Sequence, residues 1–270
     1  MKIEILTLFP EMFGEVFGVS MLGRAIENGT LEIDIHNIRD YSTDKHKKTD
    51  DYPFGGGAGM LLMPQPIFDA LQNLGTEGKR LIYMSPRGHI LDGERIAGLA
   101  KEENIVILCG HYEGLDQRVI DRFGFEEVSV GDYILTGGEL PAMMLTDAVC
   151  RLLPGVLGNA SAHDEESVYS GLLEYPQYTR PAVYRDDSAE GGIDLAVPEV
   201  LTSGNHKEIH LWNFRKSLEL TAERRPDLLK KFIELHENEA ALPEAKRLTK
   251  PERKILTEVA DRFNAGTKSL

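Results

Sequence analysis

The feature that most constrains the fold is an alternation of strand-like and helix-like segments up to about Gly158. Strand-like runs lie at 3–9, 30–38, 79–84, 104–110 and 125–135, and helical patterns lie between them at 10–29, 63–75 and 91–103. The run 104–110, NIVILCG, is apolar on both faces, as is typical of strands buried in a parallel sheet. This order predicts an α/β domain with a mainly parallel sheet.

The composition changes after this region. Residues 158–171, GNASAHDEESVYSG, are small, polar and acidic, which favours a flexible connection. Helical patterns follow at 203–225, 226–239 and 250–264, with Leu211, Phe214 and Leu218 on one face of the first and Thr249 as a cap of the last. We therefore expect a first domain at 1–160, a linker at 161–174 and a helical domain at 175–270.

Charge and cysteine usage exclude several classes of protein. A formal net charge of −14 argues against binding nucleic acid through bulk electrostatics, although positive charge is concentrated at 39–48 and 224–231. Cys109 and Cys150 have no metal-type spacing, so we expect neither a disulfide framework nor a metal site. No apolar run reaches the roughly 18 residues of a membrane span. Glu4 and Glu11 interrupt the N-terminus where a signal peptide would be apolar, so a cytoplasmic location is expected.

Three glycine-containing loops follow predicted strands, at 84–89, 109–118 and 129–141, and a fourth glycine cluster lies at 51–60. None has the Walker or dinucleotide-binding spacing. Ligands of open α/β sheets bind at the carboxyl ends of strands, so the three loops together predict a compact pocket that uses backbone groups. The alternative reading of each loop is a tight turn with no ligand.

These loops are part of a longer series of motifs. FPEMF, DDYPFGGGAGM, SPRG, CGHYEGLDQR, SVGDYILTGGELPAM, RLLPGVLGN, GLLEYPQYTRP, VPEVLTSGNHKEI and RRPDLL occur in this order from Met1 to about residue 235. The series resembles the TrmD family of bacterial tRNA (guanine-N1)-methyltransferases, of the SPOUT class. The resemblance implies a deep trefoil knot in the α/β domain, a helical tRNA-binding domain and a homodimer whose active site uses both subunits. Residues beyond about Glu239 match no motif and form a C-terminal extension.

The resemblance also implies a cofactor site for S-adenosylmethionine. In the family the knot loops bind this molecule in a bent conformation, which here corresponds to 83–88, 110–114 and 129–141. The expected cofactor-binding residues are Tyr83, Met84, Ser85, Pro86, Gly88, Cys109, Gly110, Tyr112, Glu113, Gly114, Ser129, Val130, Gly131, Asp132, Tyr133, Ile134, Leu135, Gly137, Gly138 and Pro141.

The reaction implied is methylation of guanine N1 in tRNA, at the guanosine immediately 3′ of the anticodon. It requires a base for the N1 proton and a cation near O6. Arg151 matches the family's arginine. Glu166 aligns with the family's catalytic aspartate, a departure from Asp to Glu with Val168 in place of the usual Phe. Asp164 or Glu165 remain alternatives for the base.

Two other functions remain open. The departure at Glu166 is compatible with a tRNA-binding relic that has lost catalysis, and other SPOUT enzymes methylate the ribose 2′-hydroxyl. Mg²⁺ dependence is a further expectation from the family. We also expect residues 164–170 to be mobile without tRNA and to order when it binds.

The tRNA is expected to contact both domains. A base that enters such a pocket must leave its stack, and several residues match family positions near that base or on the RNA surface. They are Arg24, His46, Asp50, Asp51 and Gly59 in the first domain, and Ser203, Gly204, His206, Arg224 and Arg225 in the helical domain.

Overall fold

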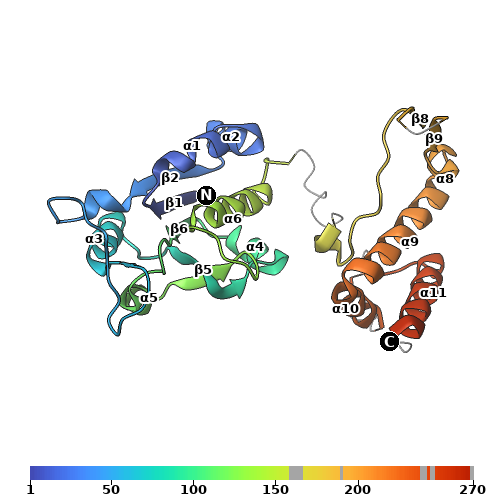
Figure 1. Cartoon of the computed structure of the whole chain (residues 1–270). Helices are drawn as coiled ribbons and strands as arrows, with labels where there is room; N and C mark the ends of the chain where they lie inside the picture. The colour runs from blue at the N-terminus through green and yellow to red at the C-terminus, as the bar shows by residue number, and fades with distance from the viewer. Residues whose placement is uncertain (158–166, 189–190, 238–241, 244–246, 268–270) are drawn as a thin grey trace. The chain divides into compact units, whose positions relative to one another are not determined.

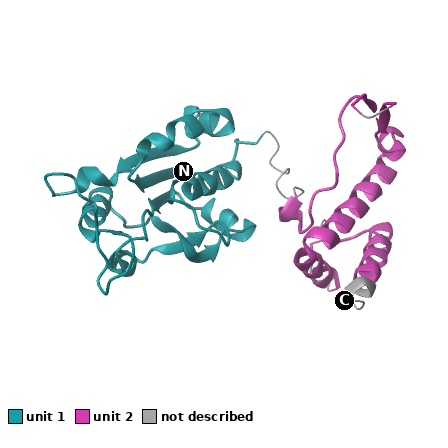
Figure 2. Ribbon diagram, viewed as in Figure 1, with its two compact units in different colours: residues 1–160 teal, residues 161–270 magenta. Residues whose placement is uncertain are grey.

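The structure is a computed structural model that describes residues 1–157, 167–188, 191–237, 242–243 and 247–267. The chain forms two compact units, Met1–Ala160 and Ser161–Leu270 (Figure 2). Among the described residues, no helix has the length and apolar character of a membrane span. Each unit has its own hydrophobic core, so each is described by itself.

Unit 1 is built on a five-stranded parallel sheet, as the sequence predicts. Its strand order is β2-β1-β6-β5-β7, and Figure 1 labels the first four of these strands. The strands are β1 (Lys2–Thr7), β2 (Glu32–Asn37), β5 (Arg80–Ile90), β6 (Asn104–Cys109) and β7 (Glu126–Ser129). Ile105 and Ile107 of β6 enter one core, and Val106 and Leu108 enter the other. Both faces of this strand are therefore buried.

Helices cover both faces of the sheet. One face packs against α1 (Gly14–Phe17), α2 (Ser20–Glu27), α4 (Gly93–Leu99) and α6 (Glu139–Arg151), and the other against α3 (Pro64–Leu74) and α5 (Gln117–Phe123). Shorter elements are η1 (Pro10–Met12) and η2 (Ile38–Tyr41), and the strands β3 (Asp50–Asp51) and β4 (Leu61–Leu62), which form a separate two-stranded sheet. The parallel order places the carboxyl ends of β5, β6 and β7 at one edge of the sheet.

The single helix predicted at 10–29 is wrong. The chain there forms η1, α1 and α2, with a break at Gly18 and Val19. Ser20 has a positive φ of 58°, which a continuous right-handed helix does not allow. A Cβ on Gly23 would lie 2.8 Å from the carbonyl carbon of Gly18. The two short helices therefore meet backbone to backbone.

Two further differences concern the strands. The predicted strand at 125–135 ends at Ser129, because its hydroxyl accepts from the Gly131 amide at 3.2 Å and turns the chain. The predicted loop at 84–89 lies inside β5. Its register against β7 shifts between Met84 and His89, both of which pair with Val128, so residues 85–88 bulge out of the strand.

The helix α5 was not predicted, because the expected loop at 109–118 covers its first two residues, Gln117 and Arg118.

Unit 2 is mostly helical. It contains η3 (Ser167–Ser170), α8 (Glu199–Thr202), α9 (His206–Arg224), α10 (Pro226–Glu237) and α11 (Lys250–Thr267). The predicted face of α9 is confirmed, because Leu218 is buried and Leu211 and Phe214 pack against the same core. The C-terminal extension contributes Ile255 and Leu256 of α11 to this core. An antiparallel hairpin of β8 (Val183–Asp186) and β9 (Ile193–Ala196) was not predicted.

The start of α11 is fixed by a reciprocal cap, as expected at Thr249. The Thr249 amide donates to the Glu252 carboxylate at 2.7 Å, and His210 of α9 contacts the same carboxylate at 2.8 Å. Burial acts to raise the pKa of Glu252, but the hydrogen bonds from Thr249 and His210 outweigh it, so the pKa is lowered. The ionised side chain therefore stabilises unit 2.

We expect Glu252→Gln to lower the free energy of unfolding by about 1 kcal/mol at pH 7, because charged hydrogen bonds are stronger than neutral ones. A lowered folded-state pKa gives stability that is present above the ordinary value of 4.5 and is lost as the pH falls through the lowered pKa. The difference in unfolding free energy from the native chain should therefore shrink below about pH 4.5.

The measurement is chemical denaturation followed by the fluorescence of Trp212, the single tryptophan of the chain, which lies in α9 of this unit. Glu234→Gln, at an exposed position of α10, is the control and should change nothing. A difference that persists unchanged at pH 3 would contradict the prediction.

Candidate active site

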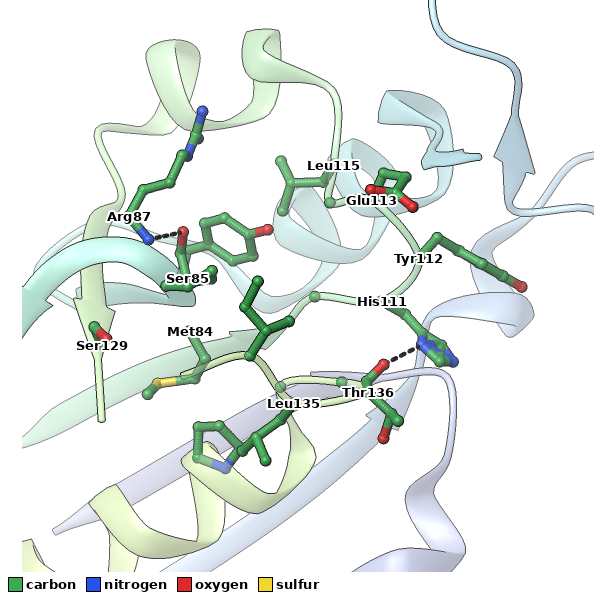
Figure 3. Close-up of a pocket in the computed structure, with 18 of the residues that line it drawn as sticks. Met84, Ser85, Arg87, His111, Tyr112, Glu113, Leu115, Ser129, Leu135 and Thr136 are labelled. Atoms are coloured by element: carbon green, nitrogen blue, oxygen red, sulfur yellow. Dashed lines mark hydrogen bonds between the residues drawn. The ribbon is translucent and has the colours of Figure 1, made fainter. Parts of the chain in front are cut away.

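A cavity of about 490 Å³ lies at the carboxyl ends of β5, β6 and β7 (Figure 3). Tyr83 and Met84 at the bulge of β5, Gly110 after β6 and Ser129 at the end of β7 contribute to its wall. The segment 133–138, which leads into α6, closes another side. Three parallel strands therefore bring their loops to one place, as the sequence predicts.

Most of the predicted cofactor residues line this cavity. They are Tyr83, Met84, Ser85, Pro86, Gly110, Tyr112, Glu113, Gly114, Ser129, Val130, Tyr133, Ile134, Leu135, Gly137, Gly138 and Pro141. Gly88, Cys109, Gly131 and Asp132 are not part of the lining. Cys109 is buried beneath it, and burial together with the nearby Glu139 raises the pKa of its thiol well above the ordinary value. Gly88 instead packs on the backbone of Glu127 and Val128.

Seven further residues line the cavity, and three of them fall inside the cofactor ranges expected from the sequence. Arg87, His111 and Thr136 fall inside the predicted ranges. Leu61 of β4, Leu115, Gln117 of α5 and Val128 of β7 were missed. Leu61 directly follows the fourth glycine cluster and lies in β4, whose Leu62 forms a bridge with Leu115. The glycine cluster at 51–60 is the only sequence signal for that side of the wall.

Glycines allow the loops to pack directly on one another. The Gly138 amide donates to the Gly110 carbonyl at 2.8 Å, and His111 forms a bridge with Gly137. A Cβ on Gly138 would lie 2.7 Å from the Gly110 nitrogen and 2.8 Å from the Cα of Cys109. Such distances are shorter than any side chain tolerates. The loop after β7 can therefore lie on the loop after β6 only if residue 138 is glycine.

Tyr83 forms the inner wall of the cavity. Its side chain lies under Gly110, where a Cβ would meet the phenol oxygen at 2.9 Å. Burial, with a smaller contribution from the negative charge of Glu127, raises the pKa of Tyr83 to about 12. The phenol is therefore protonated at neutral pH and can donate a hydrogen bond into the cavity.

A charged group lies on one side of the cavity mouth. The Ser85 hydroxyl donates to the Glu127 carboxylate at 2.8 Å, and the Arg87 guanidinium pairs with the same carboxylate at 3.1 Å. The Arg87 amide donates to the Ser85 oxygen at 3.3 Å, as Figure 3 shows. Three contacts hold the bulge 85–88 in one conformation. They also leave the cation of Arg87 at the mouth of the cavity.

His111 connects this cavity with a smaller one of about 200 Å³. Its Nδ1 lies 3.0 Å from the Thr136 carbonyl oxygen, and its ring packs edge-on against Phe9 and stacks on Tyr112. Glu139 of α6 borders the smaller cavity and is only 3% exposed. Its carboxylate accepts from the Thr7 hydroxyl at 2.7 Å. This bond joins the end of β1 to the start of α6.

The RNA-binding residues predicted in unit 1 come from separate elements. Arg24 is exposed on α2, His46 is exposed in a loop, and Asp50 lies in β3. Gly59 does not line the cavity but packs against the side chain of Glu113, which does. The residues predicted in unit 2 are Ser203 and Gly204 after α8, His206 at the start of α9, and Arg224 and Arg225 at its end.

The structure describes only one of the two predicted catalytic residues. Arg151 is the last residue of α6, and its side chain is partly buried. Glu166 lies outside the described residues, as do its alternatives Asp164 and Glu165. The role of each in catalysis therefore stays a prediction from the sequence.

Three potential metal ligands converge in unit 1, away from the cavity. Oxygen and nitrogen atoms of Glu4, Asp34 and His36 lie within 4.8 Å of one another. Lys79 donates to Glu4 at 2.5 Å, and Lys2 pairs with Asp34 at 2.6 Å. Two ammonium groups thus supply the positive charge that a metal ion would bring. We assign the group a structural role at the β1–β2 edge.

The chain matches the family described as tRNA (guanine-1)-methyltransferase TrmD over residues 1–231. It is 53% identical to a tRNA (guanine-N(1)-)-methyltransferase of Alkaliphilus metalliredigens, over 89% of this chain and 96% of the relative. It is 47% identical to a protein of the same name from Bacillus cereus strain AH820, over 97% of this chain and 99% of the relative. The second alignment extends into the C-terminal extension that no sequence motif covers.

Proposed function

Because the chain belongs to the TrmD family of tRNA (guanine-1)-methyltransferases, we propose that it methylates N1 of the guanosine immediately 3′ of the anticodon. Methylation of guanine in tRNA is the activity of the family, and S-adenosylmethionine is its methyl donor. The position in the tRNA follows from the motif resemblance. The observation that carries the proposal is the cavity enclosed by the three strand-end loops.

The cavity fits the methyl donor in size and chemistry. Its volume of about 490 Å³ is within the range of small-molecule sites, which is roughly 300–1,000 Å³. Leu115, Leu135 and Pro141 offer an apolar wall for a purine ring. Backbone groups of the glycine loops offer donors and acceptors for ribose hydroxyls. When bound there, S-adenosylmethionine supplies an electrophilic methyl group on a cationic sulfur.

The side chains outside the cavity are proposed to activate the guanine. Neutral N1 carries a proton, so its lone pair becomes available only when a base takes that proton. We assign this role to the Glu166 carboxylate. The negative charge then moves toward O6, where the Arg151 guanidinium stabilises it. The departure from Asp to Glu changes the reach of the base by one methylene and leaves its chemistry intact.

A homodimer is part of the proposal. Leu140 and Met144 lie one turn apart on α6 and are each about half exposed. Met12 is also exposed and borders the same small cavity as Leu140. Exposed apolar side chains on adjacent elements are typical of protein interfaces. Sedimentation should give twice the chain mass of 30.1 kDa, and a mass of one chain at micromolar concentration would contradict the dimer.

Three finer properties belong to the same proposal. The direct backbone contacts of Gly138 on Gly110 support a knotted arrangement of the loops, as in the SPOUT class. A dependence on Mg²⁺ is expected from the family resemblance. A cytoplasmic location is expected because tRNA is modified there.

The experiment that tests the function is methyl transfer from labelled S-adenosylmethionine to unmodified tRNA. Label in the RNA supports the enzyme, whereas tRNA binding without label supports a non-catalytic relic. Nuclease digestion and mass spectrometry of the product then distinguish methylation of the base from methylation of the ribose. Methyl on the 2′-oxygen would contradict the proposal.

A further inference from the structure

The loop at 52–60, which connects β3 and β4, presents two aromatic side chains to solvent. Phe54 is fully exposed, and Tyr52 is 77% exposed. Gly55, Gly56 and Gly57 follow Phe54, and all three have a positive φ. A phenylalanine gains nothing for folding at such a position, because it buries no apolar surface. At the tip of a glycine loop the ring is therefore available to a partner outside the chain.

The base of this loop is fixed to the rim of the cavity. The Glu113 amide donates to the Met60 carbonyl at 3.0 Å, and the Leu62 amide donates to the Gly114 carbonyl at 2.9 Å. Both Glu113 and Gly114 line the cavity. Glu113 also packs against Gly59 of the loop. Phe54 is thus carried on a segment whose ends contact the proposed methyl-donor site.

The surroundings of the loop favour a polyanionic partner. Lys45, His46 and Lys47 are exposed just before β3. The Met63 amide donates to the Thr49 carbonyl at 2.8 Å, which ties the end of this basic segment to the end of β4. Lys48 pairs with Asp51 at 3.1 Å, so the basic segment and the aromatic loop are joined at β3. An aromatic ring beside a basic segment is the combination that binds single-stranded nucleic acid.

We propose that Phe54 is a stacking platform for the nucleobase next to the guanine that is methylated. The inference rests on the proposed function and adds a contact to it. When the guanine leaves its stack to enter the site, the neighbouring base loses a stacking partner. The Phe54 ring replaces that partner at the rim of the site. The contact is independent of the base identity, because every base has a π-face.

The test is the binding of unmodified tRNA to Phe54→Ala in the presence of S-adenosylhomocysteine. A stacking contact of this kind is worth roughly a 5- to 150-fold change in affinity. Phe54→Leu is the matched control: it keeps an apolar side chain but has no ring, and it should lose as much as alanine. Phe54→Trp should keep the affinity. Because Phe54 is fully exposed, the thermal stability and the affinity for S-adenosylhomocysteine should stay unchanged in all three variants.

A second measurement locates the contact. An anticodon stem-loop with 2-aminopurine one position 5′ or 3′ of the target guanine should lose fluorescence on binding to the native chain at one of these positions. The loss should be absent with Phe54→Ala. Native methyl transfer together with unchanged affinity for both Phe54→Ala and Phe54→Leu would overturn the inference and leave the proposed function intact. A native chain that transfers no methyl group to tRNA would overturn the proposed function instead.

Discussion

Replacing Glu166 with glutamine is expected to reduce kcat for methyl transfer by roughly 10²- to 10⁴-fold, the usual contribution of a general base. Glutamine has almost the same shape but cannot accept the N1 proton. The affinity for S-adenosylhomocysteine should not change, because the cavity is formed by residues 61–141. Single-turnover methyl transfer at saturating tRNA measures the chemical step directly.

The neighbouring carboxylates provide matched controls. Asp164→Asn and Glu165→Gln remove the same charge from the same acidic segment, so both should have small effects on kcat. Arg151→Ala should reduce kcat without unfolding the protein, because its side chain is only partly buried at the end of α6. If Glu166→Gln stays near native activity while Asp164→Asn does not, the base is two residues earlier in the chain.

Replacing Gly138 with alanine is expected to reduce methyl transfer by about 10²-fold, because a displacement of ~1 Å near a reacting group has an effect of this size. The added Cβ would lie 2.7 Å from the Gly110 nitrogen and 2.8 Å from the Cys109 Cα, and both are backbone atoms that cannot rotate away. The two loops must separate, which also breaks the 2.8 Å bond between the Gly138 amide and the Gly110 carbonyl. Overpacking of this kind typically costs 1–3 kcal/mol of stability.

Titration with S-adenosylhomocysteine measures this effect apart from tRNA binding, and it should show a large loss of affinity. Gly98→Ala is the matched control. Gly98 lies in α4, and a Cβ there has no atom within 4 Å. That substitution should keep full activity and raise the stability by up to about 1 kcal/mol, because alanine favours helix over glycine. Native affinity for the ligand in Gly138→Ala would contradict the packing argument.

The sheet was predictable because each strand carries its own signal. The run at 104–110 is apolar on both faces, and the structure buries both. The break of the helix at 10–29 was not predictable from periodicity. It coincides with the positive φ of Ser20 and the close approach of Gly23 to Gly18, and neither is visible in the spacing of apolar residues. The hairpin β8–β9 was missed because each strand has only four residues and its apolar side chains, among them Val183, Ile193 and Leu195, face no core.

The site was predictable where glycines mark the ends of strands. Ser85, Gly110 and Gly138 come from three such loops and line one cavity. Leu61 was missed because it reaches the wall from β4, outside those loops, and Gln117 because it is the first residue of α5, beyond the cofactor range expected at 110–114. The hydrogen bond between Thr7 and Glu139 spans 132 positions of the chain, and neither residue belongs to a motif that pairs them. Contacts of this range depend on the topology of the sheet.

The helix α6 connects the two halves of the proposed chemistry and also keeps them apart. Gly138 and Pro141 at its beginning line the cavity, and Arg151 is its last residue. From Glu139 to Arg151 an α-helix advances about 18 Å, which is longer than an extended arginine side chain. This separation fits the proposal that the Arg151 guanidinium acts on a guanine beside the methyl donor held by the partner subunit. Dissociation of the proposed dimer would stop turnover while leaving ligand binding intact, so protein concentration itself would control the enzyme.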